Sequence, residues 1–109
     1  MELVTKECTP CQGGVAPMHC DLAERYVAEV SGWDLLDGAT KVKRTFKFDN
    51  FIDALAFTQK VGELCEEEGH HADITVGWGY ARVVFQTHKI NGLHENDFIM
   101  AAKVNALFD

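Results

Sequence analysis

The spacing of hydrophobic residues along the chain changes between two periods, and these changes mark the predicted elements. Apolar residues recur at helical spacing over residues 20–30, 50–69 and 94–108. Gly32 follows the first of these segments as a helix stop, and Asn50 can cap the second through its side chain. The pattern therefore predicts three helices, of which the middle one is the longest.

Between the helices, apolar and polar residues alternate with the period of two that is typical of half-buried strands. Four segments show this alternation: residues 33–36, 41–48, 73–78 and 80–88. Asp37-Gly38 separates the first two and favours a tight type I′ turn, and Gly79 separates the last two. The pattern predicts two hairpins.

Two hairpins set between three helices predict an α+β domain. We expect a four-stranded antiparallel sheet with three helices on one face, in the order α-β-β-α-β-β-α. The domain should span residues 20–109. Residues 1–19 hold both prolines and show no periodicity, so an irregular N-terminal segment is expected there.

The same alternation indicates which side chains face the core. On the middle helix, the predicted apolar stripe is Phe51, Ala54, Leu55, Val61, Leu64 and Cys65. On the last strand, the predicted core face is Ala81, Val83, Phe85 and Thr87, which places His88 on the opposite face. The last helix is apolar around most of its circumference, which suggests that it also packs on a second surface, as in an oligomer.

Composition and charge narrow the classes of function. The chain has 109 residues and a formal net charge of −7, which disfavours direct binding to nucleic acid or to anionic lipid. No apolar run approaches the roughly 20 residues of a membrane span, and the first residues lack the apolar stretch of a secretory signal. We therefore expect a cytoplasmic protein that binds neither a membrane nor nucleic acid.

Three of the five histidines are predicted to converge. His70 and His71 precede the third strand and His88 ends the fourth, so an antiparallel hairpin brings all three to the same end. Imidazoles in one pocket can donate one proton and accept another. Glu66, Glu67 and Glu68 sit unfavourably at the negative end of a helix, and they would favour the charged form of nearby imidazoles. The alternative is a solvated acidic face beside two surface histidines.

Metal binding is a competing hypothesis at two places. Three histidines can hold a catalytic zinc ion, but adjacent residues on an extended backbone point to opposite faces, which argues against His70 and His71 sharing one ion. Near the N-terminus, four potential zinc ligands lie within thirteen residues: Cys8, Cys11, His19 and Cys20. Cys8 and Cys11 form a CxxC motif that could instead be redox-active, although no βαβ pattern surrounds it. Reduced cysteines without a catalytic role are the simpler interpretation, and Cys65 fits a buried core thiol. Trp78 and Tyr80 could stack on a flat ring, although hairpin aromatics are more often core residues.

The segments GHHADITVGW and VVFQTHKINGLHENDFIMAA resemble the pterin-4a-carbinolamine dehydratases. The shared pattern is a carboxylate before a His-His pair, an aromatic residue, a third histidine and an aspartate. In this chain these are Glu66, His70, His71, Trp78, His88 and Asp97. The resemblance extends over about ninety residues, from the first helix to the end.

The resemblance implies dehydration of 4a-hydroxytetrahydropterin to the quinonoid dihydropterin, the recycling step after aromatic amino-acid hydroxylation. It implies no cofactor and no metal, a homodimer or homotetramer, and an aromatic amino-acid hydroxylase as a possible partner. The family's substrate site maps onto Gly69, His70, His71, Trp78, Gln86, Thr87, His88, Lys89 and Asp97. We expect His70 and His88 to exchange the acid and base protons while His71 orients the ring.

A second function is implied by the same family, because its animal members also act as dimerisation cofactors of a homeodomain transcription factor. A non-catalytic protein-binding module is therefore the alternative. The chain departs from the family at Ala72, where a proline usually follows the His-His pair, and at His94, where Ser or Thr commonly opens the last helix. His19 takes the equivalent place in the first helix. Neither departure removes a proposed catalytic group.

Overall fold

The four predicted strands pair into one antiparallel sheet in the computed structural model, which describes residues 2–8 and 16–109. The strands are β1 (Asp34–Leu36), β2 (Lys41–Lys47), β3 (Asp73–Gly77) and β4 (Tyr80–Phe85). Their order in the sheet is β1-β2-β4-β3, so each hairpin contributes one central and one edge strand. The pairing of β2 with β4 joins the two hairpins.

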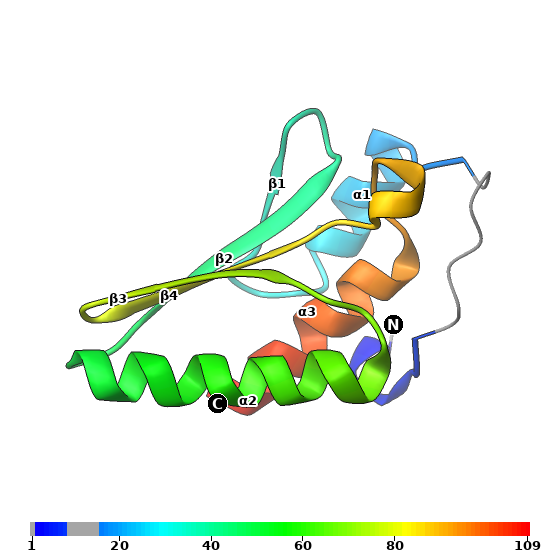
Figure 1. Ribbon diagram of the computed structural model, residues 1–109. Coiled ribbons are helices and arrows are strands. Elements are labelled where there is room, and N and C mark those ends of the chain that lie inside the picture. The colour runs from blue at the N-terminus through cyan, green and yellow to red at the C-terminus, as the bar shows by residue number, and fades with distance from the viewer. Residues whose placement is uncertain (1, 9–15) are drawn as a thin grey trace.

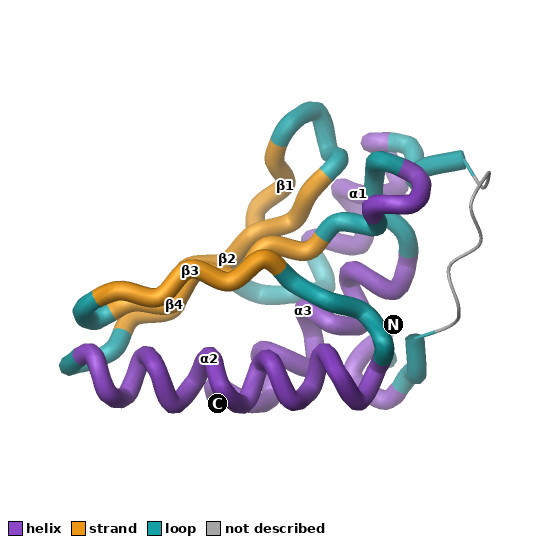
Figure 2. Tube along the Cα trace, in the orientation of Figure 1, coloured by secondary structure: helices purple, strands orange, loops and turns teal. Residues whose placement is uncertain are grey.

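Three α-helices alternate with the hairpins in the predicted order. They are α1 (Cys20–Val27), α2 (Phe51–Glu68) and α3 (Glu95–Phe108), and two short 3₁₀ helices, η1 (Leu3–Thr5) and η2 (His88–Ile90), precede α1 and α3. Figure 1 shows α2 running along the sheet with α3 beside it on the same side. Figure 2 shows the sheet as a twisted layer over these helices. The predicted α+β architecture is confirmed.

The core lies between this face of the sheet and the helices. The sheet contributes Val42, Phe46, Ala81, Val83 and Phe85 to the buried cluster, and the three from β4 lie on the face that alternation predicts. Every α-helix adds buried side chains to the same cluster, including Ala23 of α1, Val61 of α2 and Phe98 of α3. The three helices therefore pack on one face of the sheet, as expected.

The predicted ends of α2 are confirmed. Asn50 Oδ1 accepts a hydrogen bond of 2.8 Å from the backbone N–H of Asp53, which satisfies a donor that the first turn leaves free. Gly69 has φ +69° and ends the helix in the left-handed conformation that favours glycine. The chain therefore leaves α2 immediately before His70.

The predictions for the first hairpin loop and for the end of α1 need correction. Leu36 pairs with Lys41 across the first hairpin, so the loop has four residues rather than the two of a type I′ turn, although Asp37 and Gly38 both have positive φ. α1 ends at Val27 instead of Val30, because the chain turns at residues 28–32 before Gly32 adopts φ +86°. β1 then begins at Asp34.

The apolar stripe predicted for α2 was partly wrong. The buried positions are Ala54, Phe57, Val61 and Cys65, which follow one another at intervals of three and four residues. Phe51 and Leu55 lie on another part of the helix surface, and together with Ile52 they form an exposed apolar patch. We call Phe51, Ile52 and Leu55 the α2 patch.

The N-terminal segment supplies part of the second surface expected against α3. Leu3 of η1 is buried in the main core cluster, and η1 packs against α3. Part of the apolar circumference of α3 is thus covered within the chain itself.

Among the described residues, none of the helices combines the length and the apolar character that crossing a membrane requires.

Candidate active site

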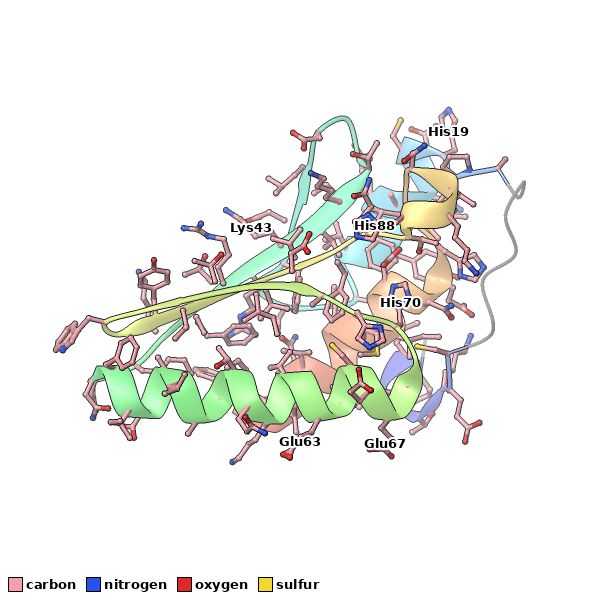
Figure 3. All side chains as sticks on the ribbon, in the orientation of Figure 1. His19, Lys43, Glu63, Glu67, His70 and His88 are labelled. Atoms are coloured by element: carbon pink, nitrogen blue, oxygen red, sulfur yellow. The ribbon has the colours of Figure 1, made fainter. Side chains whose placement is uncertain are left out.

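The β3–β4 hairpin brings two distant segments to one end of the sheet. Asp73 of β3 pairs with Val84 of β4, so the residues before Asp73 and those after Val84 lie side by side. Between them is a pocket of about 360 Å³, lined by Gly69, His70, His71, Gln86, Thr87, His88 and Lys89. Figure 3 shows His70 and His88 at this end. The structure thus places the three predicted histidines on one pocket.

Asp97 fixes the His70 ring. His70 Nε2 lies 2.6 Å from Asp97 Oδ1, and the Asp97 side chain is fully buried at the first turn of α3. Thr87 Oγ1 donates to Asp97 Oδ2 at 2.7 Å, and the His94 backbone N–H donates to the same oxygen at 3.0 Å. Because Oδ2 already takes these two donors, Oδ1 is left to contact His70 Nε2, and this contact fixes the position of the ring.

A core aromatic ring fixes the orientation of His70 from another side. Its imidazole stacks on Phe85 with a centroid distance of 6.0 Å and an interplanar angle of 15°. Only 11% of the His70 side chain is exposed, so the ring has little freedom to turn. The alternation along β4 predicts Phe85 only as a core residue. The signal for its second role is its position at the end of β4, next to the segment that enters the pocket.

His71 and His88 are more accessible than His70. His71 Nε2 lies 2.7 Å from Glu66 Oε1, and both side chains are largely exposed. Glu66, one of the three carboxylates at the unfavourable end of α2, therefore has an imidazole partner. His88 is exposed at the first residue of η2. A backbone bridge between Thr87 and Gly92 closes the short loop that carries it.

Two predicted substrate contacts lie elsewhere. Trp78 is 74% exposed in the turn between β3 and β4, at the opposite end of the hairpin from His70. An extended strand carries the chain about 3.3 Å per residue, so Trp78 does not join the pocket of its own chain. Asp97 has no exposed surface with which to touch a substrate, and its place is behind His70.

The two remaining histidines are helix caps. His19 Nδ1 accepts from the Asp21 backbone N–H at 3.3 Å, and His94 Nδ1 accepts from that of Asn96 at 3.1 Å. Each ring satisfies a donor that its helix leaves free. At both positions a ring nitrogen of histidine is the capping acceptor, in place of the hydroxyl oxygen that Ser or Thr usually provides.

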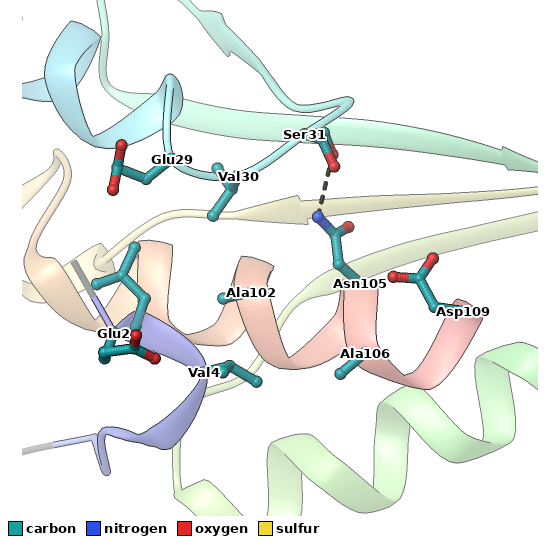
Figure 4. Close-up of a pocket in the computed structure, with 10 residues that line it drawn as sticks. Glu2, Val4, Glu29, Val30, Ser31, Ala102, Asn105, Ala106 and Asp109 are labelled. Atoms are coloured by element: carbon teal, nitrogen blue, oxygen red, sulfur yellow. Dashed lines mark hydrogen bonds between the residues drawn. The ribbon is translucent and has the colours of Figure 1, made fainter.

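A second cavity, of about 290 Å³, lies between η1, α3 and the loop after α1 (Figure 4). Its lining includes the carboxylates Glu2, Glu29 and Asp109, and Asn105 Nδ2 donates to the Ser31 carbonyl at 3.0 Å across it. The described lining residues include no histidine or cysteine. This cavity therefore lacks the imidazole groups that line the histidine pocket.

The structure separates the N-terminal zinc candidates. Cys8 is half-buried, with its thiol 4.0 Å from the Asn96 carbonyl, whereas His19, Cys20 and Asp21 form an exposed group with ligand atoms within 4.8 Å of one another. Cys11 lies outside the described residues. In the part of the chain that the structure describes, the pocket imidazoles do not form such a group. Cys65 is buried in the core, as predicted.

The described cysteines should differ in reactivity. Burial raises the pKa of the Cys8 thiol from its usual 9.0 to about 12, and the nearby Glu68 carboxylate acts in the same direction. Burial also raises the pKa of Cys65. Because the thiolate is the nucleophile, we expect iodoacetamide at pH 8 to modify the exposed Cys20 at least about tenfold faster than Cys8. Peptide mass mapping over time measures both rates, and equal rates would contradict the buried environment of Cys8.

Comparison with known proteins matches this fold and pocket to one family. A family model described as pterin 4 alpha carbinolamine dehydratase matches residues 16–107. A relative from Methylococcus capsulatus, provisionally named a pterin-4-alpha-carbinolamine dehydratase, is 66% identical over 105 residues, covering 96% of this chain and 92% of its own. A relative from Halorhodospira halophila with the same provisional name is 58% identical and covers 98% of both chains.

Solved structures show the same fold in proteins with different descriptions. A transcriptional coactivator/pterin dehydratase from Brucella melitensis superposes with a TM-score of 0.76 at 28% identity, over 85% of this chain and 98% of that one. A pterin dehydratase-like protein described as a RuBisCO assembly factor in the alpha-carboxysome gives 0.60 at 25% identity, over 70% and 88%. With a family model that spans nearly the whole described domain and relatives of such high identity, the chain belongs to the pterin-4-alpha-carbinolamine dehydratase family.

Proposed function

We propose that this protein dehydrates a 4a-hydroxytetrahydropterin to the quinonoid dihydropterin and water. The observation that carries the proposal is the pocket in which His70, His71 and His88 meet, with His70 held between Phe85 and the buried Asp97. A ring with a fixed position and orientation is what proton transfer at a fixed substrate atom requires. The family of the chain supports the same reaction.

The reaction needs one proton delivered and one removed. The bond between C4a and the hydroxyl oxygen breaks, and the leaving hydroxyl takes a proton to become water. The N5 proton is removed, and its electron pair forms the C4a–N5 double bond of the product. No net proton is consumed. We assign the two transfers to His70 and His88, one as acid and the other as base, since they face the pocket from its two segments.

The rest of the pocket holds the ring. Gly69 and His71 on one side, and Gln86, Thr87 and Lys89 on the other, provide the surface for a flat heterocycle. The His71 imidazole is oriented by Glu66, which suits it to direct the substrate. The proposed site therefore omits Trp78 and treats Asp97 as a positioning residue. The proposal includes no cofactor, and the substrate would come from an aromatic amino-acid hydroxylase.

The reaction is tested by rapid mixing of the protein with enzymatically generated 4a-carbinolamine. We expect the absorbance change of dehydration to exceed the spontaneous rate by at least about tenfold and to rise in proportion to protein concentration. A reaction without protein gives the spontaneous rate. A rate that does not depend on protein concentration would exclude dehydratase activity.

A protein-binding role is the second candidate, and one observation favours it. The α2 patch exposes three large apolar side chains next to one another, which is typical of a surface that contacts another protein. The structural relatives described as a coactivator and as an assembly factor are consistent with this role. A homodimer or homotetramer would cover such a surface. Replacing Ile52 with Lys should then lower the molecular mass of the assembly measured by light scattering. Dehydration should persist if each monomer holds a complete site.

A further inference from the structure

A carboxylate at the end of α2 fastens the loop that carries His70. Glu68 lies two residues before His70, and its side chain is only 12% exposed. Its Oε1 accepts a hydrogen bond of 3.1 Å from the backbone N–H of Cys8, and its Oε2 lies 3.7 Å from Lys103 Nζ on α3. Glu68 thus ties the last turn of α2 both to the N-terminal segment and to α3.

The same N-terminal segment is also tied to the beginning of α3. Lys6 Nζ lies 3.0 Å from Glu95 Oε2, and Glu95 is two residues before Asp97. Tyr26 Oη donates to the same carboxylate oxygen at 2.9 Å, and the Lys6 contact contributes most to lowering the pKa of Glu95. Residues 6–8 therefore bridge the two backbone segments that support His70 and Asp97.

The placement of Glu68 is unfavourable for the helix alone. A carboxylate in the last turn faces the negative end of the helix dipole. Its two partners, a backbone N–H and the ammonium group of Lys103, whose side chain is 17% exposed, offset this cost. Exposed Glu67, the preceding residue of the helix, points away from the sheet in Figure 3. A local preference that is overridden beside a candidate site commonly reflects a need of that site.

We propose that Glu68 is a positioning residue for His70. By joining α2 to Cys8 and Lys103, its carboxylate sets where Gly69 and His70 leave the helix, and so keeps the His70 ring in register with Asp97. The inference rests on the proposed function for its kinetic consequence, because a displaced imidazole transfers protons poorly. The placement of the ring itself can be measured without any activity.

The experiment compares Glu68→Ala with Glu67→Ala, which removes an equal charge from the exposed neighbour. We expect Glu68→Ala to shift the His70 imidazole resonances in NMR spectra and to lower kcat for 4a-carbinolamine about tenfold, with KM changed less than about twofold. Glu67→Ala should leave both at the wild-type values. A role in stability alone would lower the melting temperature but leave kcat of the folded protein and the His70 resonances unchanged.

Two milder variants keep the test decisive if Glu68→Ala does not fold. Glu68→Gln retains an oxygen that can accept from Cys8 but loses the attraction to Lys103, and Lys103→Met removes the ion pair from the other side. Both should shift the His70 resonances by less than Glu68→Ala. Resonances that match those of Glu67→Ala in all the folded variants would overturn the proposal. If wild type itself does not accelerate dehydration, the proposed function fails while the NMR comparison still decides the role of Glu68.

Discussion

Replacing His70 with alanine is expected to lower the rate of 4a-carbinolamine dehydration by about 10²- to 10⁴-fold, the usual contribution of a positioned acid or base. The imidazole is the one pocket histidine that is held on two sides, by the Asp97 carboxylate at 2.6 Å and by the Phe85 ring. Asp97, which contacts the ring, has no exposed surface from which to carry out the proton transfer itself. Rapid mixing under single-turnover conditions measures the loss directly.

The matched control for His70→Ala is His19→Asn. His19 is exposed and caps α1, and asparagine retains the capping acceptor, so the rate should stay within about twofold of wild type. His88→Ala should resemble His70→Ala because the reaction needs both transfers. If His70→Ala folds normally and still dehydrates at the wild-type rate, the assignment of His70 is wrong.

Much of the fold is predictable from the sequence because single residues set the ends of helices and a short period sets the buried face of a strand. The Asn50 cap, the Gly69 stop and the buried face of β4 follow from one residue or from a period of two. The α2 stripe was less predictable. Phe51 and Leu55 are as apolar as Phe57, and only the position of the helix against the sheet determines which of them is buried.

In the candidate site, too, local patterns predict some features, while others depend on how distant segments pack together. That His70 and His88 lie at one end follows from antiparallel pairing, which sequence can indicate. The role of Asp97 behind His70, rather than against a substrate, depends on how α3 packs below the pocket. The contacts of Glu68 with Cys8 and Lys103 join residues 60 and 35 positions apart. Interactions over such separations leave no periodic signal in the chain.

Phe85→Ala should reduce the free energy of unfolding by about 3–5 kcal/mol, the usual cost of removing a fully buried phenylalanine. Phe85 has no exposed surface, and its ring contacts both Trp33, at a centroid distance of 5.8 Å, and His70. A small domain has only about 5–15 kcal/mol in total, so the variant should also melt at least about 10 °C lower. Urea denaturation followed by tryptophan fluorescence and a calorimetric scan measure the two quantities.

Phe85→Leu is the informative companion variant, because it keeps most of the buried volume while removing the ring that stacks on His70. Its cost in stability should stay below about 1.5 kcal/mol. Its dehydration rate should nevertheless fall, since His70 would lose one of the two contacts that orient its imidazole. A leucine variant with normal stability and reduced kcat would separate the packing role of Phe85 from its role at the site. If Phe85→Ala lost less than about 1 kcal/mol, the ring could not be the buried link between the core and the pocket.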